Sequence, residues 1–179
     1  MLAKRGLKAG ADKIFMGLTW MQFLGYLLED GQLKPDPEKV AAIKRLLPPN
    51  TRTQLRSFLG LTGYYREFIR GYAQLARPMS TLLQESVPWD WNSACQQAFE
   101  KLKTLLMSEP ILAAPEPDRP FIVHTDYSQH ALGAILEQQK ADNKCHVISC
   151  ASRNCTPAEA KLGLTDGEVL ALVFAVKFK

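Results

Sequence analysis

Two carboxylates in the last third of the chain have the residue type and the setting of a metal site. Asp126 lies near the end of residues 121–126, an apolar run that reads as a strand, and Glu168 lies in the first turn of a predicted helix. Carboxylates held on a rigid strand and helix suit Mg²⁺, a hard cation that takes oxygen ligands. Such an ion activates water and stabilises the leaving oxygen in phosphodiester cleavage.

Each of these residues also has a structural reading, and spacing alone leaves both readings open. Thr165 and Glu168 have the spacing of a capping box, in which the glutamate would bond amides at the start of the helix. The residues after Asp126 are also typical of a turn. His124 shares a strand face with Asp126, but a lone strand histidine is more often structural than a metal ligand.

A basic segment lies in the first half of the chain. The whole chain carries a net charge of +4, but residues 34–77 alone carry +6. One basic segment in a chain that is otherwise near neutral indicates an anionic partner, or else a solvated helix face. Its nine basic residues are Lys34, Lys39, Lys44, Arg45, Arg52, Arg56, Arg66, Arg70 and Arg77.

The spacing within this segment predicts a helix from about residue 50 to residue 70 with a basic face. At about 100° per residue, four arginines fall within an arc of about 80°. They are Arg52, Arg56, Arg66 and Arg70. Gly63 falls in the same arc, and because glycine costs helix stability its presence predicts the close approach of a backbone or a ligand. The alternative is a kink or break at Gly60 and Gly63, which would destroy the alignment.

The other predicted elements position these residues in an α+β order. Residues 12–33 read as strand, turn and strand. Asp36 and Pro37 have the types of an N-cap and a first helical residue, and Pro48 ends that helix. A helix over 92–107 precedes a proline-rich linker at 110–120, which we predict to be a domain boundary. Then come strands at 121–126, 131–138 and 145–151, and a helix at 165–178.

Composition excludes several classes of protein. The 179 residues are 46% hydrophobic and 22% charged, as in ordinary globular domains. The longest apolar run is far shorter than the ~20 residues of a membrane span, and no signal-peptide cleavage site follows residues 14–28. The four cysteines form no Cys-x-x-Cys pair, so we expect an intracellular, reducing compartment, cytoplasmic or nuclear, and no membrane partner.

Taken together, the motifs resemble the reverse transcriptase and ribonuclease H region of gypsy-like long-terminal-repeat retroelements and retroviruses. The resemblance runs in order along nearly the whole chain. It is carried by residues 23–26 and 36–43, by 54–69, by 89–112, by 121–136 and by 151–171.

The resemblance implies roles for particular residues. Asp126 and Glu168 match the first two metal-binding carboxylates of a ribonuclease H site, with Mg²⁺ as the ion. Residues 52–70, with Gly63, match the thumb helix that follows a primer–template duplex, here an RNA/DNA hybrid or duplex nucleic acid. Phe23, Leu24, Gly25 and Tyr26 match the hairpin that grips the primer end.

The resemblance also implies what we expect to be missing. The polymerase carboxylates and the last two ribonuclease H aspartates would lie outside the chain, so neither active site would be complete, and the chain alone would bind Mg²⁺ weakly and not cleave. Tyr127 stands where the family usually has a small residue. The strand at 121–126 would keep an unpaired edge in the sheet. If the reading frame continues, the rest of the Pol polyprotein would be a partner.

The implied fold is α+β, with a helical thumb and connection followed by a truncated ribonuclease H-like mixed sheet of three strands and one helix. The implied domains are a palm end at 1–33, a thumb and connection at 34–109, a linker at 110–120 and an incomplete ribonuclease H-like domain at 121–179. We expect nucleic-acid contact. The alternatives are a non-catalytic protein-interaction module and a decayed reading frame.

Overall fold

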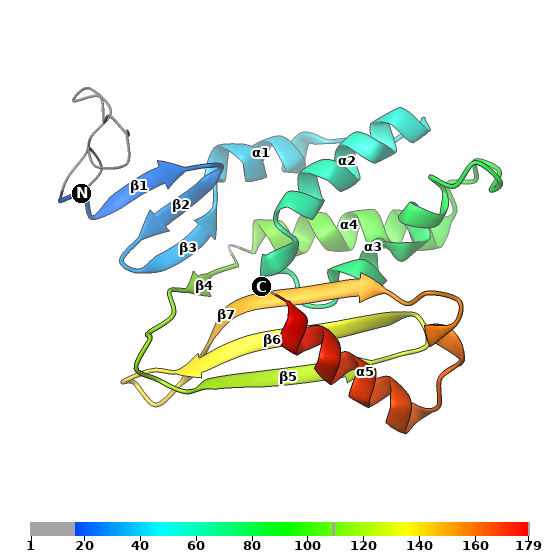
Figure 1. Ribbon diagram of the computed structural model, residues 1–179. Coiled ribbons are helices and arrows are strands. Elements are labelled where there is room, and N and C mark those ends of the chain that lie inside the picture. Colours follow the sequence, from blue (N-terminus) through cyan, green and yellow to red (C-terminus); the bar gives the residue numbers. More distant parts are fainter. Residues whose placement is uncertain (1–16, 109, 179) are drawn as a thin grey trace, which may run out of the picture.

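The computed structural model describes residues 17–108 and 110–178, so the part of the predicted strand region before Gly17 lies outside the described residues. The fold is α+β: two antiparallel sheets flank a group of helices (Figure 1). The strands are β1 (Trp20–Phe23), β2 (Tyr26–Glu29), β3 (Gln32–Pro35), β4 (Leu112–Ala113), β5 (Phe121–Tyr127), β6 (Ala131–Gln139) and β7 (Cys145–Asn154). The α-helices are α1 (Pro37–Arg45), α2 (Arg52–Tyr64), α3 (Tyr72–Thr81), α4 (Ser93–Met107) and α5 (Leu164–Lys177).

The first sheet has the order β1-β2-β3-β4, and tight turns join its first three strands. Leu24 and Gly25 connect β1 to β2 with φ values of +49° and +76°. Asp30 and Gly31 connect β2 to β3 with φ values of +48° and +70°. Two successive residues with positive φ give a turn whose twist matches that of a hairpin.

Local signals place the first helices where we predict them. The side chain of Asp36 accepts a hydrogen bond of 2.9 Å from the backbone N–H of Glu38, and Pro37 is the first helical residue of α1. Thr51 caps α2 and Asn92 caps α4 in the same way. Phe58 and Phe99 pack 4.6 Å apart between ring centroids, so α2 and α4 share one core.

The predicted continuous helix up to residue 70 is wrong, because α2 ends at Tyr64. A 3-10 turn, η3 (Arg66–Phe68), follows, and α3 begins after Gly71, which has φ of +66°. The side chains of Tyr65, Phe68 and Ile69 are buried in the core. Phe68 and Ile69 follow Tyr65 by three and four residues, a spacing that would place all three on one face of a straight helix. In the fold the chain turns at Tyr65, and the turn brings all three side chains into the core. The shared arc of four arginines is lost with the helix.

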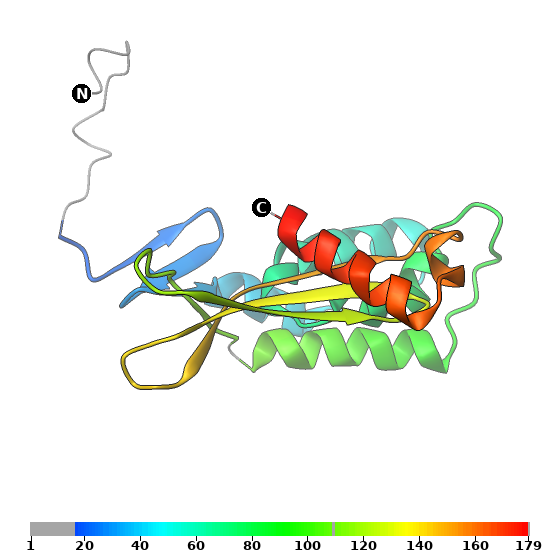
Figure 2. The same ribbon diagram turned by 60° about the horizontal axis from the view of Figure 1, so that its bottom comes forward.

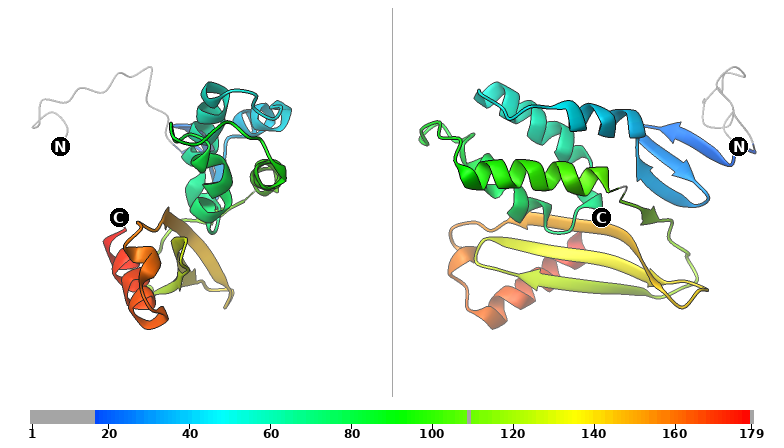
Figure 3. Two further views of the ribbon diagram at one scale, coloured as in Figure 1. Left: turned by 90° about the vertical axis from the view of Figure 1, so that its right-hand side faces the viewer. Right: turned by 180° about the vertical axis from the view of Figure 1, so that it is seen from behind.

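The second sheet has the order β5-β6-β7 and is antiparallel throughout its described strands. Its two faces have different neighbours (Figure 3). Tyr127, Leu132 and Ala171 form a small core between one face and α5. Ser152 belongs to the other face, and its hydroxyl accepts a hydrogen bond of 2.9 Å from the backbone N–H of Ala73 at the start of α3. The sheet is therefore held between α5 and the helices.

Strand β7 is the strand of the second sheet that lies beside the helices (Figure 1 and Figure 2). Polar contacts join it to them. Besides the bond from Ala73, the guanidinium of Arg66 donates a hydrogen bond of 2.9 Å to the backbone oxygen of Ser152. Val147, farther along β7, packs against the helical core. These contacts set the position of the second sheet relative to α3.

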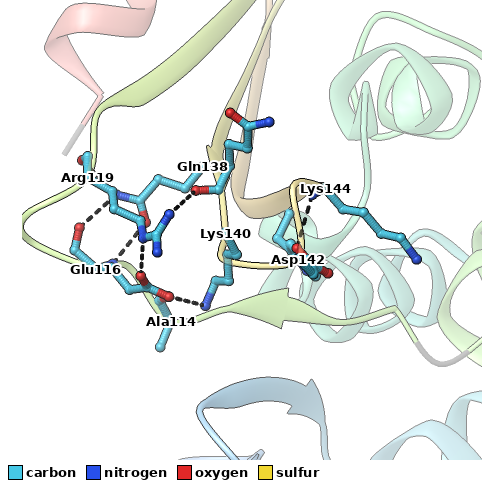
Figure 4. Close-up of polar contacts among 9 residues, drawn as sticks. Ala114, Glu116, Arg119, Gln138, Lys140, Asp142 and Lys144 are labelled. Carbon is cyan, nitrogen blue, oxygen red and sulfur yellow. Dashed lines mark hydrogen bonds and ion pairs between the residues drawn. The ribbon is translucent and has the colours of Figure 1, made fainter.

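The proline-rich segment is docked rather than merely extended. Leu112 and Ala113 form β4 against β3, and a polar cluster holds the next turn (Figure 4). The buried side chain of Gln138 accepts a hydrogen bond of 2.8 Å from the N–H of Glu116. It also donates to the backbone oxygens of Glu116, at 2.8 Å, and Arg119, at 3.0 Å. This one side chain fastens the segment to β6, while the predicted domain boundaries remain predictions.

Candidate nucleic-acid interface and carboxylate pair

Asp126 lies on the face of β5 that is turned toward the helices. Its register partners are Gly133 on β6 and then Ser152 on β7. The Asp126 side chain is exposed and lies over Gly133, where an added Cβ would be 3.8 Å from the Asp126 Cβ. Arg70 and Gly71 line the same small cavity of about 40 Å³. The carboxylate is thus open to solvent with a cation in its neighbourhood.

Glu168 lies on α5, the helix that packs on the opposite face of the sheet. Its side chain is exposed. The alternative of a capping box is wrong, because the N-cap of α5 is Gly163 and no side chain caps that helix. Thr165 and Glu168 both lie inside the helix, so the carboxylate is not used at the helix start. That Asp126 and Glu168 share one ion remains a prediction from the resemblance.

The described residues contain no cluster of three or more His, Cys, Asp or Glu side chains that could hold a metal ion. His124 belongs to a structural pair instead, with its Nε2 3.2 Å from the Glu137 carboxylate. Asp126 and Glu168 are the oxygen donors that a hard cation would take, and both are free of ion pairs among the described residues.

Tyr127 is accommodated by the absence of a side chain at Gly167. A Cβ on Gly167 would lie 2.1 Å from Cδ1 of the Tyr127 ring. The Tyr127 hydroxyl donates to the backbone oxygens of Glu159 and Leu162, at 2.8 and 3.3 Å. The expected crowding by Tyr127 is therefore directed into the core under α5, on the face opposite to Asp126.

An ion pair holds the segment that leads into α5. Both terminal nitrogens of Arg153 lie 2.7 Å from the two carboxylate oxygens of Glu159. The Thr156 N–H donates to the same carboxylate at 2.8 Å. Arg153 first, and then this N–H, lower the pKa of Glu159 to about 2. Arg153 also lies over the ring of Phe174, 5.6 Å from its centroid.

The four predicted arginines have different roles. Arg52 donates from Nε to the backbone oxygen of Leu82 at 3.0 Å and from Nη2 to that of Val87, so it ties α2 to the end of α3. Arg66 bonds Ser152, as described above, while its side chain stays exposed. Arg56 and Arg70 are exposed, and no hydrogen bond or ion pair joins either guanidinium to another described residue. These two are the arginines most available to an anion.

The close approach predicted at Gly63 is made by a protein side chain. A Cβ there would lie 3.4 Å from the hydroxyl of Tyr72. That hydroxyl lies 3.0 Å from the Thr62 hydroxyl and donates to the backbone oxygen of Leu59 at 3.2 Å. The small residue makes room for the α2–α3 contact.

The predicted hairpin has an exposed tip that is fastened to the end of α2. The side chains of Phe23 and Leu24 are 59% and 69% exposed, which is unusual for apolar residues on a turn held in place. Gly25 lies beneath the ring of Tyr64, which a Cβ would meet at 3.3 Å. The Tyr26 ring stacks on that of Tyr64, with 5.0 Å between centroids.

Sequence reasoning missed the two tyrosines that hold the turn. The hydroxyl of Tyr64 donates to the backbone oxygen of Leu24, and that of Tyr65 donates to Gly25 at 2.9 Å. Burial, with the nearby Asp36 charge, raises the pKa of Tyr65 to about 12. The signal that could have found them is the adjacent aromatic pair, of which only one ring can face the core of a helix.

Comparison with known proteins shows the class to which this chain belongs: part of a reverse transcriptase with a ribonuclease H-like domain. Residues 91–179 match the family model described as the RNase H-like domain found in reverse transcriptase, and that part of the chain belongs to this family. The homologues are retrotransposon and retroviral Pol polyproteins.

Three relatives illustrate the range of sequence identity and of the organisms in which such polyproteins occur. The chain is 39% identical over 177 residues to the retrovirus-related Pol polyprotein from transposon 297 of Drosophila melanogaster. That match covers 98% of this chain and 16% of the polyprotein. It is 31% identical to the transposon Tf2-3 polyprotein of Schizosaccharomyces pombe, over 88% of this chain and 12% of the relative. It is 36% identical to the Gag-Pol polyprotein of baboon endogenous virus, over 77% of this chain and 8% of that polyprotein.

Solved structures share the fold. The foamy viral protease-reverse transcriptase in complex with RNA/DNA hybrid matches with a TM-score of 0.74 and 20% identity, over 88% of this chain and 21% of that chain. The same protein in complex with double-stranded DNA matches with a TM-score of 0.75 and 20% identity, over 89% of this chain and 33% of that chain. No helix among the described residues is long and apolar enough to cross a membrane.

Proposed function

We propose that this chain contacts duplex nucleic acid, and an RNA/DNA hybrid in particular, as the thumb and ribonuclease H-like part of a reverse transcriptase. The observation that carries the proposal is the pair of exposed guanidinium groups of Arg56 on α2 and Arg70 in the turn before α3, both in the basic segment and both without a partner among the described residues. Phosphate contacts by arginine hold a duplex without reading its sequence. The foamy viral proteins of the same fold were solved with such duplexes.

The hairpin supplies a second element of the proposed surface. Its exposed Phe23 and Leu24 would meet the sugars and bases at a duplex end, since apolar and aromatic side chains stack there. The tip is firmly joined to α2, so hairpin and thumb would approach a duplex as one unit. Gly25 and Tyr26 belong to this joint rather than to the exposed surface.

We further propose that Asp126 and Glu168 are half of a ribonuclease H site. Asp126 and Glu168 come from opposite sides of the edge strand β5, so their carboxylates would have to meet at that edge to hold one Mg²⁺. The ion would supply activation of water and stabilisation of the leaving oxygen. Both side chains are exposed, so a cation from solvent can reach them. Two carboxylates alone would hold the ion weakly, so the chain itself would act by contact.

A binding experiment with charge variants tests this function. Fluorescence anisotropy would follow a labelled RNA/DNA hybrid between 50 and 200 mM salt. We expect the affinity to fall steeply with salt, and each of Arg56→Gln and Arg70→Gln to lower the slope of log K against log salt by about 1. Lys101→Gln, an exposed charge on α4, is the control. Absence of hybrid binding, or a salt-independent affinity, would contradict the proposal.

One observation favours the second candidate, a protein-interaction module. The outer side of α5 exposes Val169, Leu172, Val173 and Val176, which is more apolar surface than a solvated helix needs. Leu172→Glu with Val176→Glu would then abolish capture of a protein partner and leave hybrid affinity unchanged. If Arg56→Glu and Arg70→Glu abolish both hybrid binding and capture of the protein partner, the two activities use one surface.

A further inference from the structure

A polar groove lies between α3 and the end of the second sheet. It encloses about 450 Å³ and lies where the turn between β5 and β6 approaches α3. Its lining comes on one side from α3 and the chain just after it, and on the other from the end of β7 and the loops at this end of the sheet. The lining residues that carry the argument are Arg77, Ser80 and Gln84 on the first side, and Gln129, His130 and Asn154 on the second.

The charge of the groove is unbalanced. Arg77 is half-buried, and within residues 17–108 and 110–178 its guanidinium makes no hydrogen bond or ion pair. No carboxylate of the residues that the structure describes lines the groove. Two acids adjoin groove residues in the chain and do not line it: Glu85 follows Gln84, and Glu159 precedes Ala160. Glu159 is already held by both terminal nitrogens of Arg153 and by the Thr156 N–H. A partly desolvated cation without a counter-charge is stabilised by any anion that enters.

Arg77 lines the groove together with Cys155, the residue that follows β7. Its charge opposes the rise in the pKa of the Cys155 thiol that burial causes. Most of the other side chains that line the groove are uncharged donors and acceptors, beside the apolar Pro157 and Ala160. The ring of His130 has no partner among the described residues. A tetrahedral oxyanion has the charge and the acceptors that this set can bind.

We propose that this groove binds a phosphate of the nucleic-acid backbone, with Arg77 as its charged anchor. The inference rests on the proposed function and extends it, because it adds a contact that spans the helices and the sheet. On the helical side, Arg77 lies on α3, which begins just after Arg70. On the sheet side, Gln129 lies two residues beyond the end of β5, the strand that carries Asp126. A nucleic-acid backbone bound at Arg77 would therefore contact the junction between the helices and the second sheet.

Arginine is suited to this contact because its planar fork bonds two phosphate oxygens at once. The uncharged amides and hydroxyls can accept or donate according to the rotation of the phosphate. Such contacts carry no sequence preference. The expected effect of losing Arg77 is hence a uniform loss of affinity across hybrid sequences.

The test uses the full chain and a labelled RNA/DNA hybrid. We expect Arg77→Gln to weaken binding at least fivefold at 100 mM salt and to lower the salt slope by about 1. Arg77→Lys should keep the slope and lose part of the affinity. Gln84→Glu, which adds a carboxylate at an exposed position of the groove, should weaken binding as much without touching the core. Lys101→Gln on α4 is matched in charge and should have the smallest effect.

The outcomes separate this proposal from the proposed function. If Arg77→Gln and Gln84→Glu bind the hybrid like Lys101→Gln while Arg70→Gln is weakened, the groove proposal is wrong and the function stands. If the unaltered chain does not bind the hybrid, both are wrong. A titration with inorganic phosphate, followed by the amide resonances of Gln129 and His130, distinguishes the sources. Saturation by phosphate with no effect of Arg77→Gln on hybrid affinity would identify a site for the free ion only and overturn the proposal.

Discussion

The ring of Tyr127 on β5 occupies the space in which a side chain of Gly167 on α5 would lie. The distance from an added Cβ to Cδ1 of the ring would be 2.1 Å, and three ring atoms would lie within 2.5 Å. Real carbon atoms do not approach so closely, so a large residue on the strand and the absence of a side chain on the helix fit each other. This pair brings α5, and with it Glu168, close to the sheet.

Replacing Gly167 therefore tests how α5 is seated. We expect Gly167→Ala to lower the free energy of unfolding by about 1–3 kcal/mol, because the methyl group forces ring or helix to move. Urea unfolding followed by circular dichroism measures the loss. Gly60→Ala on α2 is the control, since nothing lies within 4 Å of its Cβ, and it should stabilise by about 0.5–1 kcal/mol. Equal effects of the two substitutions would contradict the fit.

A second prediction concerns the hydroxyl of Tyr65 and the hairpin turn. Tyr65→Phe keeps the buried ring but removes the bond to Gly25, so the amides of β1 and β2 should exchange hydrogen faster. The expected loss of stability is about 1 kcal/mol. Hydrogen exchange with mass spectrometry of residues 20–29 is the measurement. Tyr72→Phe, which removes a hydroxyl bonded only within the helices, should leave that hairpin unchanged. Unchanged exchange in Tyr65→Phe would show that the bond does not hold the turn.

The contrast between Arg52 and Arg56 gives a third prediction on one helix. Arg52 bonds the carbonyl groups of Leu82 and Val87, whereas Arg56 is exposed without such partners. We expect Arg52→Gln to destabilise the fold by about 1–3 kcal/mol and Arg56→Gln to change it by less than about 0.5 kcal/mol. Thermal unfolding measures stability. An effect of Arg52→Gln as small as that of Arg56→Gln would mean that Arg52 is a surface charge as well.

The acid range provides a fourth prediction, through Glu159. Its folded-state pKa, about 2, lies below the ordinary value of 4.5, so folding favours the charged carboxylate. The stabilisation is complete above about pH 4.5 and is lost as the pH falls through 2. Glu159→Gln should thus be less stable than the unaltered chain at pH 6, and the difference should shrink between pH 5 and pH 2. A difference that stays constant over this range would rule out the ion pair with Arg153 as its source.

Local chemistry in the sequence was sufficient for most of the elements. Helices start at Asp36 and Asn92 because these side chains accept hydrogen bonds from free amides within the next turn, whatever surrounds them. Pro37 suits the first helical position. The apolar run of β5 and the apolar pattern of α5 likewise need only neighbours in the chain. The α+β order and the family resemblance follow from these short-range patterns.

Tertiary packing decided what the functional side chains do. The break at Tyr65 arises because three apolar side chains must reach one core, and no periodicity within the segment reports that core. Arg52 became a structural residue because the carbonyl groups of Leu82 and Val87 come close only in the folded chain. Gln138, the Tyr127–Gly167 contact and the groove at Arg77 each join segments far apart in sequence. Such long-range contacts depend on where whole elements lie, which spacing along the chain does not encode.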